Sequence, residues 1–79
     1  MAKPNTALIY RRVPLFLREM REKAGLTQRQ LAEKIGKTQW WIARSETGSR
    51  RIDIAEFVEF CIGCDVDAAE AVTQLSRRR

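Results

Sequence analysis

The chain contains no histidine, only two cysteines and no apolar run long enough to cross a membrane. Histidine is the most frequent general base and a common metal ligand, so its absence removes the usual centre of a catalytic or metal site. The chain also lacks clustered carboxylates and a Gly-rich loop that could hold a phosphate. We therefore expect a protein that is not an enzyme and that uses no cofactor and no metal.

The two cysteines also bear on the compartment. Two thiols do not make the disulfide framework of a small secreted domain, so a reducing compartment is expected. Residues 1–13 lack the apolar core of a signal peptide. Together these features predict a cytoplasmic protein without a membrane partner.

Cys61 and Cys64 form a single CxxC pair, a spacing found in redox sites and in half of some zinc sites. A redox pair usually follows a strand, and zinc needs four ligands that this chain does not easily supply. Both cysteines fall instead in an apolar helical stretch, where a free cysteine behaves as a small hydrophobic residue. The sequence therefore favours a packing role for both thiols.

The net charge of +5 is unevenly distributed along the chain. Residues 1–52 carry twelve Lys or Arg against four Glu, a balance of +8. Residues 53–76 carry six acidic residues and no basic one, and residues 77–79 are all Arg. Positive charge concentrated in one half is the pattern expected of a nucleic-acid-binding surface.

Residues 27–48, TQRQLAEKIGKTQWWIARSETG, predict two short helices joined by a tight turn. Thr27 can cap the first helix, and Gln30 can complete a capping box. Gly36 suits the turn because glycine tolerates the left-handed backbone region. Thr38 can cap the second helix. Two short helices so closely joined are typical of a helix-turn-helix.

The second of these helices divides into two faces at helical periodicity. One face holds Trp41, Ile42 and Ser45 and suits a core. The opposite face carries an amide, an aromatic ring, a small residue and a guanidinium, from Gln39, Trp40, Ala43 and Arg44. These groups suit base edges, because arginine pairs with guanine, glutamine pairs with adenine and an apolar group meets the thymine methyl. Ordinary solvated surface is the alternative for the polar pair, whereas an exposed tryptophan normally has a partner.

Further segments flank the motif. Arg50 and Arg51 form a basic loop after it, suited either to phosphate contacts at the edge of a groove or to simple solvation. Residues 1–9 are predicted to be a flexible N-terminal arm, because Pro4 interrupts them and chain ends are usually mobile. Residues 77–79 are predicted to be a basic C-terminal tail.

Three further helices complete one all-α domain in residues 10–76. The first contains Pro14, which fits the first turn of a helix. Asp53 and Asp67 can cap the last two helices. The residues expected to face inward on those two helices are Phe57, Val58, Phe60, Cys61, Val72 and Leu75. We predict five short helices in a compact bundle without strands.

Several positions of the motif occur at a fixed spacing: Gln28, Ala32, Gly36, Ile42, Glu46 and Gly48. In these positions the chain resembles the Cro/phage-repressor helix-turn-helix family, also called the XRE-type family, over about residues 12–76. The resemblance implies a lambda-repressor-like fold of five helices. It also implies a bacterial or phage regulator of transcription that binds operator DNA, usually as a homodimer.

The resemblance implies roles for individual residues as well. The second motif helix would lie in the major groove, with Gln39, Trp40, Ala43 and Arg44 on base-reading positions. Gln28 matches a residue that commonly contacts a phosphate. Arg21 and Glu46 match positions that often form a structural ion pair. The full set of expected phosphate contacts is Thr27, Gln28, Lys37, Thr38, Arg50 and Arg51.

Three positions depart from the family pattern. Ser45 replaces a large apolar residue, and Trp41 is expected to fill the space. Cys64 and Asp65 replace a common Leu-Gly ending of the fourth helix. Trp40 replaces a small or polar residue, so the base preference of relatives does not carry over.

The sequence supports a sequence-specific regulator that binds double-stranded DNA and reads the major groove with residues 38–47. In this family such a regulator is most often a repressor. It is expected to bind a palindromic operator as a homodimer. The alternative is a protein-interaction or antitoxin-like module on the same scaffold, which would contact a protein partner through Trp40 and the acidic C-terminal helices. The positive half of the chain favours DNA, whereas the exposed tryptophan favours the protein partner.

Overall fold

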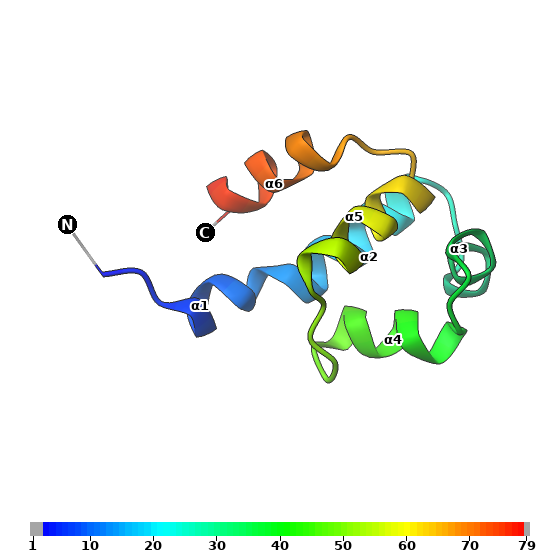
Figure 1. Cartoon of the computed structure of the whole chain (residues 1–79), viewed down its shortest axis with the longest axis horizontal. Helices are drawn as coiled ribbons and strands as arrows, with labels where there is room; N and C mark the ends of the chain where they lie inside the picture. The colour runs from blue at the N-terminus through cyan, green and yellow to red at the C-terminus, as the bar shows by residue number, and fades with distance from the viewer. Residues whose placement is uncertain (1–2, 79) are drawn as a thin grey trace.

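The computed structural model describes residues 3–78, which form six helices and no strand (Figure 1). These are α1 (Thr6–Tyr10), α2 (Arg12–Lys23), α3 (Gln28–Ile35), α4 (Gln39–Thr47), α5 (Ile54–Gly63) and α6 (Ala68–Arg77). In Figure 1, α2 and α5 cross the middle of the molecule, with α4 along one side and α6 along the other. The predicted all-α helix-turn-helix bundle is confirmed, with α3 and α4 as its motif.

The first helix, α1, was not predicted. It makes little more than one turn, overlaps residues 6–9 of the segment expected to be an arm, and contains no buried residue. The side chain of Asn5 caps it by accepting a hydrogen bond from the backbone N–H of Leu8 at 3.2 Å. A segment of five residues is too short to show helical periodicity, so the only signal was this cap. The flexibility of residues 1–9 stays a prediction, and residues 1–2 lie outside the described residues.

The basic C-terminal tail begins within a helix. α6 runs to Arg77, and Arg78 forms an ion pair with Glu19 of α2. The guanidinium carbon of Arg78 also lies 5.0 Å from the centre of the Phe16 ring. Residue 78 is therefore joined to the bundle, while residue 79 lies outside the described residues.

The predicted caps define where the motif helices begin. Thr27 Oγ1 accepts a hydrogen bond from the N–H of Gln30 at 3.1 Å, and Gln30 Oε1 accepts one from the N–H of Thr27 at 2.9 Å. Thr38 Oγ1 accepts a hydrogen bond from the N–H of Trp41 at 3.0 Å. A second capping box begins α5. Each cap satisfies a backbone donor that has no partner within the helix.

Two glycines allow close turns and contacts around α3. Gly36 adopts φ 70° between α3 and α4, in the left-handed region. Gly63, at the end of α5, serves close packing instead. A β-carbon at Gly63 would lie 2.5 Å from Leu31 Cδ1 and 2.6 Å from Ile35 Cγ2. A larger residue there would force the Leu31 and Ile35 side chains to move.

A single core joins α2 to the later helices. The rings of Phe16 and Phe57 stack with their centres 6.3 Å apart, and Cys61 Sγ lies 4.0 Å from Met20 Sδ. The buried apolar residues are Val13, Phe16, Leu17, Met20, Leu31, Ala32, Ile42, Phe57, Phe60, Cys61, Cys64 and Ala71. The inward placement predicted for Val58 and Val72 is wrong, since they are 38% and 42% exposed. The apolar faces of α5 and α6 are wider than the surface that neighbouring helices cover.

A buried ion pair connects α2 with α4. Arg21 Nε and Nη2 donate to the two carboxylate oxygens of Glu46 at 2.6 and 3.0 Å. Arg21 Nη1 donates to the backbone carbonyl oxygen of Leu26 at 2.7 Å. The hydrogen bond to Glu46 raises the pKa of Arg21 above its ordinary value. The structural pair implied by the family resemblance is confirmed.

The end of α5 shows how the chain replaces the family's Leu-Gly pair. Cys64 is 5% exposed and packs in the core. Asp65 adopts φ 58°, the left-handed conformation that glycine would take without cost. Aspartate tolerates this region better than most residues, but less well than glycine. The left-handed backbone conformation that normally ends this helix is therefore kept, although Asp65 adopts it with more strain than glycine would.

We expect Glu46→Gln to lower the free energy of unfolding by about 3–5 kcal/mol, because it leaves the Arg21 guanidinium buried without a counter-charge. Urea unfolding followed by circular dichroism measures the change. Glu22→Gln is the matched control, because Glu22 pairs with Arg18 at 3.4 Å on an exposed surface and its loss should cost less than about 1 kcal/mol. Equal losses in the two variants would contradict the structural role of the buried pair.

We expect Asp65→Gly to raise the free energy of unfolding by up to about 1 kcal/mol, because relief of the left-handed conformation should outweigh the added flexibility of the unfolded chain. Asp65→Ala should lower it, since alanine lacks the short polar side chain that eases this conformation. Thermal unfolding of the three proteins measures both effects. A glycine variant less stable than the natural chain would refute the backbone explanation.

Candidate nucleic-acid interface

α4 turns one face into the core and the opposite face toward solvent. Ile42 and Ser45 on the inner face are 0% and 1% exposed. Trp40 on the outer face is 64% exposed. The other predicted base readers share this outer face, where Gln39 is exposed and both Ala43 and Arg44 are half-buried. The structure therefore brings the four predicted readers together on one accessible surface.

Two of these readers contact each other. The guanidinium carbon of Arg44 lies 4.6 Å from the centre of the Trp40 ring, a cation–π arrangement. Across residues 3–78, the Arg44 side chain forms no ion pair with a carboxylate and donates no hydrogen bond. Its N–H donors are therefore available to a ligand.

The side chains predicted to contact phosphates at the helix starts already form hydrogen bonds within the protein. The hydroxyls of Thr27 and Thr38 accept hydrogen bonds as helix caps. Gln28 Nε2 donates to Glu46 Oε1 at 3.2 Å, so this amide joins the buried ion pair. The backbone N–H groups of the first residues, Gln28 in α3 and Gln39 in α4, have no acceptor within their helices. At both helix starts, the backbone N–H groups rather than the side chains offer donors.

Two further predicted phosphate contacts form ion pairs with α5. Arg50 Nη1 and Nη2 donate to the two carboxylate oxygens of Glu56 at 3.2 and 2.6 Å, and the hydrogen bond from Arg50 lowers the pKa of Glu56. Lys37 Nζ lies 3.6 Å from Glu59 Oε1. Both cations also lie over the Trp41 ring, at 4.8 and 5.2 Å from its centre. These pairings could not be predicted from the sequence, because the partners meet only in the folded chain.

Arg51, the last predicted phosphate contact, is exposed and rests on an aromatic ring. Its guanidinium carbon lies 4.2 Å from the centre of the Tyr10 ring. The Tyr10 hydroxyl accepts a hydrogen bond from the backbone N–H of Ile52 at 2.6 Å and so anchors the loop. Within the described part of the chain, no carboxylate pairs with Arg51. Sequence reasoning missed Tyr10, because its partner Ile52 lies 42 residues further along the chain.

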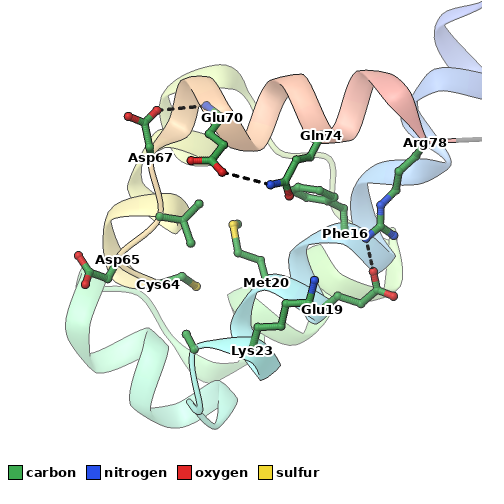
Figure 2. Close-up of a pocket in the computed structure, with 12 residues that line it drawn as sticks. Phe16, Glu19, Met20, Lys23, Cys64, Asp65, Asp67, Glu70, Gln74 and Arg78 are labelled. Atoms are coloured by element: carbon green, nitrogen blue, oxygen red, sulfur yellow. Dashed lines mark hydrogen bonds and ion pairs between the residues drawn. The ribbon is translucent and has the colours of Figure 1, made fainter.

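A hollow of about 370 Å³ lies away from this surface, between α2 and α6 (Figure 2). Its rim groups pair with one another, as Glu19 does with Arg78. The Gln74 amide nitrogen likewise lies 3.5 Å from a Glu70 carboxylate oxygen. None of the predicted base or phosphate contacts lines the hollow. It is therefore separate from the outer face of α4.

The two cysteines are buried free thiols. Burial raises the pKa of Cys61 and raises that of Cys64 to about 11. A thiol with so high a pKa is protonated at neutral pH and is a poor nucleophile. In residues 3–78, no three Cys, Asp or Glu side chains are grouped as a metal site. None of the described helices is both long and apolar enough to cross a membrane.

Comparisons with known proteins agree with this geometry. A family model described as a helix-turn-helix domain matches residues 15–73. A solved XRE-family like protein from Pseudomonas syringae pv. tomato str. DC3000 is 33% identical, with a TM-score of 0.82, over 89% of this chain and 85% of that chain. The restriction-modification controller protein C.AhdI from Aeromonas hydrophila is 25% identical, with a TM-score of 0.70, over 82% and 97%. The clp gene regulator ClgR from C. glutamicum shares the fold at 19% identity and a TM-score of 0.77, over 94% and 92%. No curated protein matches the chain.

The matched model covers most of the chain and includes all of α3 and α4. The motif positions agree with the structure, since the caps, the turn glycine and the buried ion pair all form as the pattern requires. The chain therefore belongs to the XRE-type helix-turn-helix family of DNA-binding transcription regulators.

Proposed function

We propose that the protein is a sequence-specific regulator that inserts α4 into the major groove of an operator and represses transcription by occupying it. The availability of Arg44 carries this proposal. Its guanidinium lies on the exposed face of α4 without a carboxylate partner in the described chain. An arginine so placed can donate two hydrogen bonds to guanine O6 and N7. Such a role requires DNA, so a cytoplasmic location is part of the proposal.

The remaining contacts divide between bases and backbone. Gln39 would read adenine, while Ala43 is small enough to let the helix approach the base edges. Phosphates would meet the backbone N–H groups at the helix starts, beside Thr27, Gln28 and Thr38. Exposed Arg51 would contact a phosphate directly. Lys37 and Arg50 would contact phosphates only by exchanging the carboxylates of α5 that hold them.

The outer face of α5 supports a homodimer. Ile54, Val58 and Ile62 recur every four residues and are 72%, 38% and 69% exposed. We call these three residues the α5 stripe. A second copy related by a two-fold axis would cover both stripes in a self-complementary interface. α4 packs against α2 and α3, so a partner on the α5 stripe leaves the outer face of α4 free. Two recognition helices spaced by one DNA turn, about 34 Å, fit a palindromic operator.

The similar proteins support a regulatory role. The C.AhdI protein is a restriction-modification controller protein. A comparable role for this chain requires that it recognise particular DNA sites and change transcription there.

A protein-interaction or antitoxin-like module is the second candidate, and the 64% exposure of Trp40 favours it. The acidic C-terminal helices support it less. Glu56 and Glu59 already hold Arg50 and Lys37, so these carboxylates are not free to attract a basic partner. The charged groups of the surface therefore favour DNA over a protein partner.

The decisive experiment is a binding selection from randomised duplex DNA at near-physiological salt. Recovery of an inverted repeat with fixed half-site spacing supports a dimeric, sequence-reading regulator. Binding without sequence enrichment would reject specific recognition. No binding at all would move the function to a protein partner.

Arg44→Ala should relax the preference at one base position and weaken binding to the selected site by about 1–3 kcal/mol, because a bidentate contact to guanine is lost. Arg51→Ala should weaken binding to every duplex alike. It should also reduce the slope of log K against log salt by about 0.9, the value for one phosphate contact. Titrations of both variants at several salt concentrations measure the difference. An unchanged preferred sequence in Arg44→Ala would show that the reading face is wrongly assigned.

Ile62→Lys should convert the dimer to a monomer, because a charge would enter the apolar interface of both subunits. Sedimentation analysis measures the mass, and affinity for a single half-site should stay unchanged. Leu15→Lys is the matched control. Leu15 is 54% exposed, but it belongs to α2 and is not part of the α5 stripe. A dimer that survives Ile62→Lys, or that is lost only in the control, would place the interface elsewhere.

A further inference from the structure

We infer that Trp40 and Arg44 act as one composite reader, which recognises a guanine together with the C5 methyl group of a pyrimidine in the adjacent base pair. That methyl group belongs to thymine or to 5-methylcytosine. The inference rests on the proposed DNA-binding function and names the base step that α4 reads.

The contact with the Trp40 ring holds the guanidinium without using its hydrogen-bond donors. The Arg44 guanidinium carbon lies over the Trp40 ring, 4.6 Å from its centre, and the Arg44 side chain donates no hydrogen bond within residues 3–78. The five N–H donors of arginine lie in the guanidinium plane and point away from its edge. Arg44 can therefore rest on Trp40 and pair with a base edge at the same time.

Arg50 shows the contrast. Its guanidinium also lies over a tryptophan ring, that of Trp41. Its donors, however, are directed to Glu56 and to the carbonyl oxygen of Arg51. The ring beneath it is half-buried. Among the cation–ring contacts within residues 3–78, only the Trp40 and Arg44 pair combines an exposed ring with unused guanidinium donors.

The separation within the pair is closer to one base-pair step of DNA than to two. Base pairs stack about 3.4 Å apart, and the ring and guanidinium are separated by 4.6 Å. With Arg44 in the plane of a guanine, the indole lies about one base-pair step away. The major-groove edge of that neighbouring pair offers one apolar group, the C5 methyl of a pyrimidine. The indole edge is the complementary apolar surface.

The neighbouring residues leave room for this approach. Trp40 and Arg44 are four residues apart, so their side chains meet on adjacent turns of α4. Ala43 beside them has no bulk that would hold the helix away from the base edges. With 64% of its surface exposed, Trp40 can be replaced without disturbing the core.

The test uses the duplex recovered by the selection and removes single methyl groups. Each thymine is replaced in turn by deoxyuridine, which differs only at C5, and each cytosine in turn by 5-methylcytosine. The relevant base pair is the neighbour of the guanine that Arg44→Ala no longer prefers. If that neighbour contains thymine, loss of the methyl group should weaken binding by about fourfold. If it contains cytosine, gain of the methyl group should strengthen binding by about fourfold. The first result identifies thymine and the second 5-methylcytosine as the natural ligand.

Three variants assign this methyl effect to the indole. Trp40→Ala should reduce the fourfold ratio to near one, whereas Trp40→Phe should keep most of it. Gln39→Ala is the control on the same face: it should change overall affinity but keep the full methyl ratio. Circular dichroism of each variant verifies that its total helical content is unchanged.

The outcomes separate this inference from the proposed function. Specific binding with no methyl effect beside that guanine, or with the same effect in Trp40→Ala, would overturn the composite reader while leaving the regulator intact. Absence of any sequence preference would overturn both. A methyl effect lost in Trp40→Ala but kept in Gln39→Ala would support the inference.

Discussion

The buried pair of Arg21 and Glu46 is the interaction on which the geometry of the helix-turn-helix depends. Burial makes such a pair a weak source of net stability, because both charges lose their water. Its role here is to fix the orientation of the helices that it joins. The planar guanidinium meets both carboxylate oxygens of Glu46 and also the carbonyl oxygen of Leu26 in the turn before α3. Gln28 adds a hydrogen bond from α3 to the same carboxylate. One residue of α4 is thus held from α2 and α3 together, which fixes the rotation of α4 about its own axis. That rotation decides which side chains face solvent.

The basic half of the chain is not uniformly available to a polyanion. Lys37 and Arg50 are held by carboxylates of α5, whereas Arg44 and Arg51 rest on aromatic rings. A carboxylate occupies the donors of a guanidinium, while a ring occupies only its face. A count of charges along the sequence therefore overstates the number of cations that can contact DNA without exchanging a partner. The cations held on rings are the ones that can form new hydrogen bonds at once.

Local features of the fold could be predicted from the sequence. The caps at Thr27 and Thr38, the turn at Gly36 and the two faces of α4 depend on residues within one or two helical turns. The contacts of Gln28 with Glu46 and of Arg50 with Glu56 could not, because each joins groups that meet only after folding. Periodicity also placed Val58 inside, since it reports where apolar residues recur and not how much of that face a neighbouring helix covers. The base-reading positions were predicted, and their chemical partners are proposed.

The proposed dimer connects stability with recognition. A domain of 79 residues buries only about 60% of the surface that its unfolded chain exposes, and this chain leaves the α5 stripe in water. Covering that stripe with a second copy would add apolar burial that one chain cannot provide. The same contact would present two short α4 helices to one duplex.

Each helix offers four residues to the bases, and each good contact discriminates by about 1–3 kcal/mol. A single subunit therefore has too few contacts to find one operator among many sites, whereas two subunits held in fixed register add their discrimination. The exposed apolar residues of α5 would then be as necessary for sequence recognition as the side chains of α4 that meet the bases.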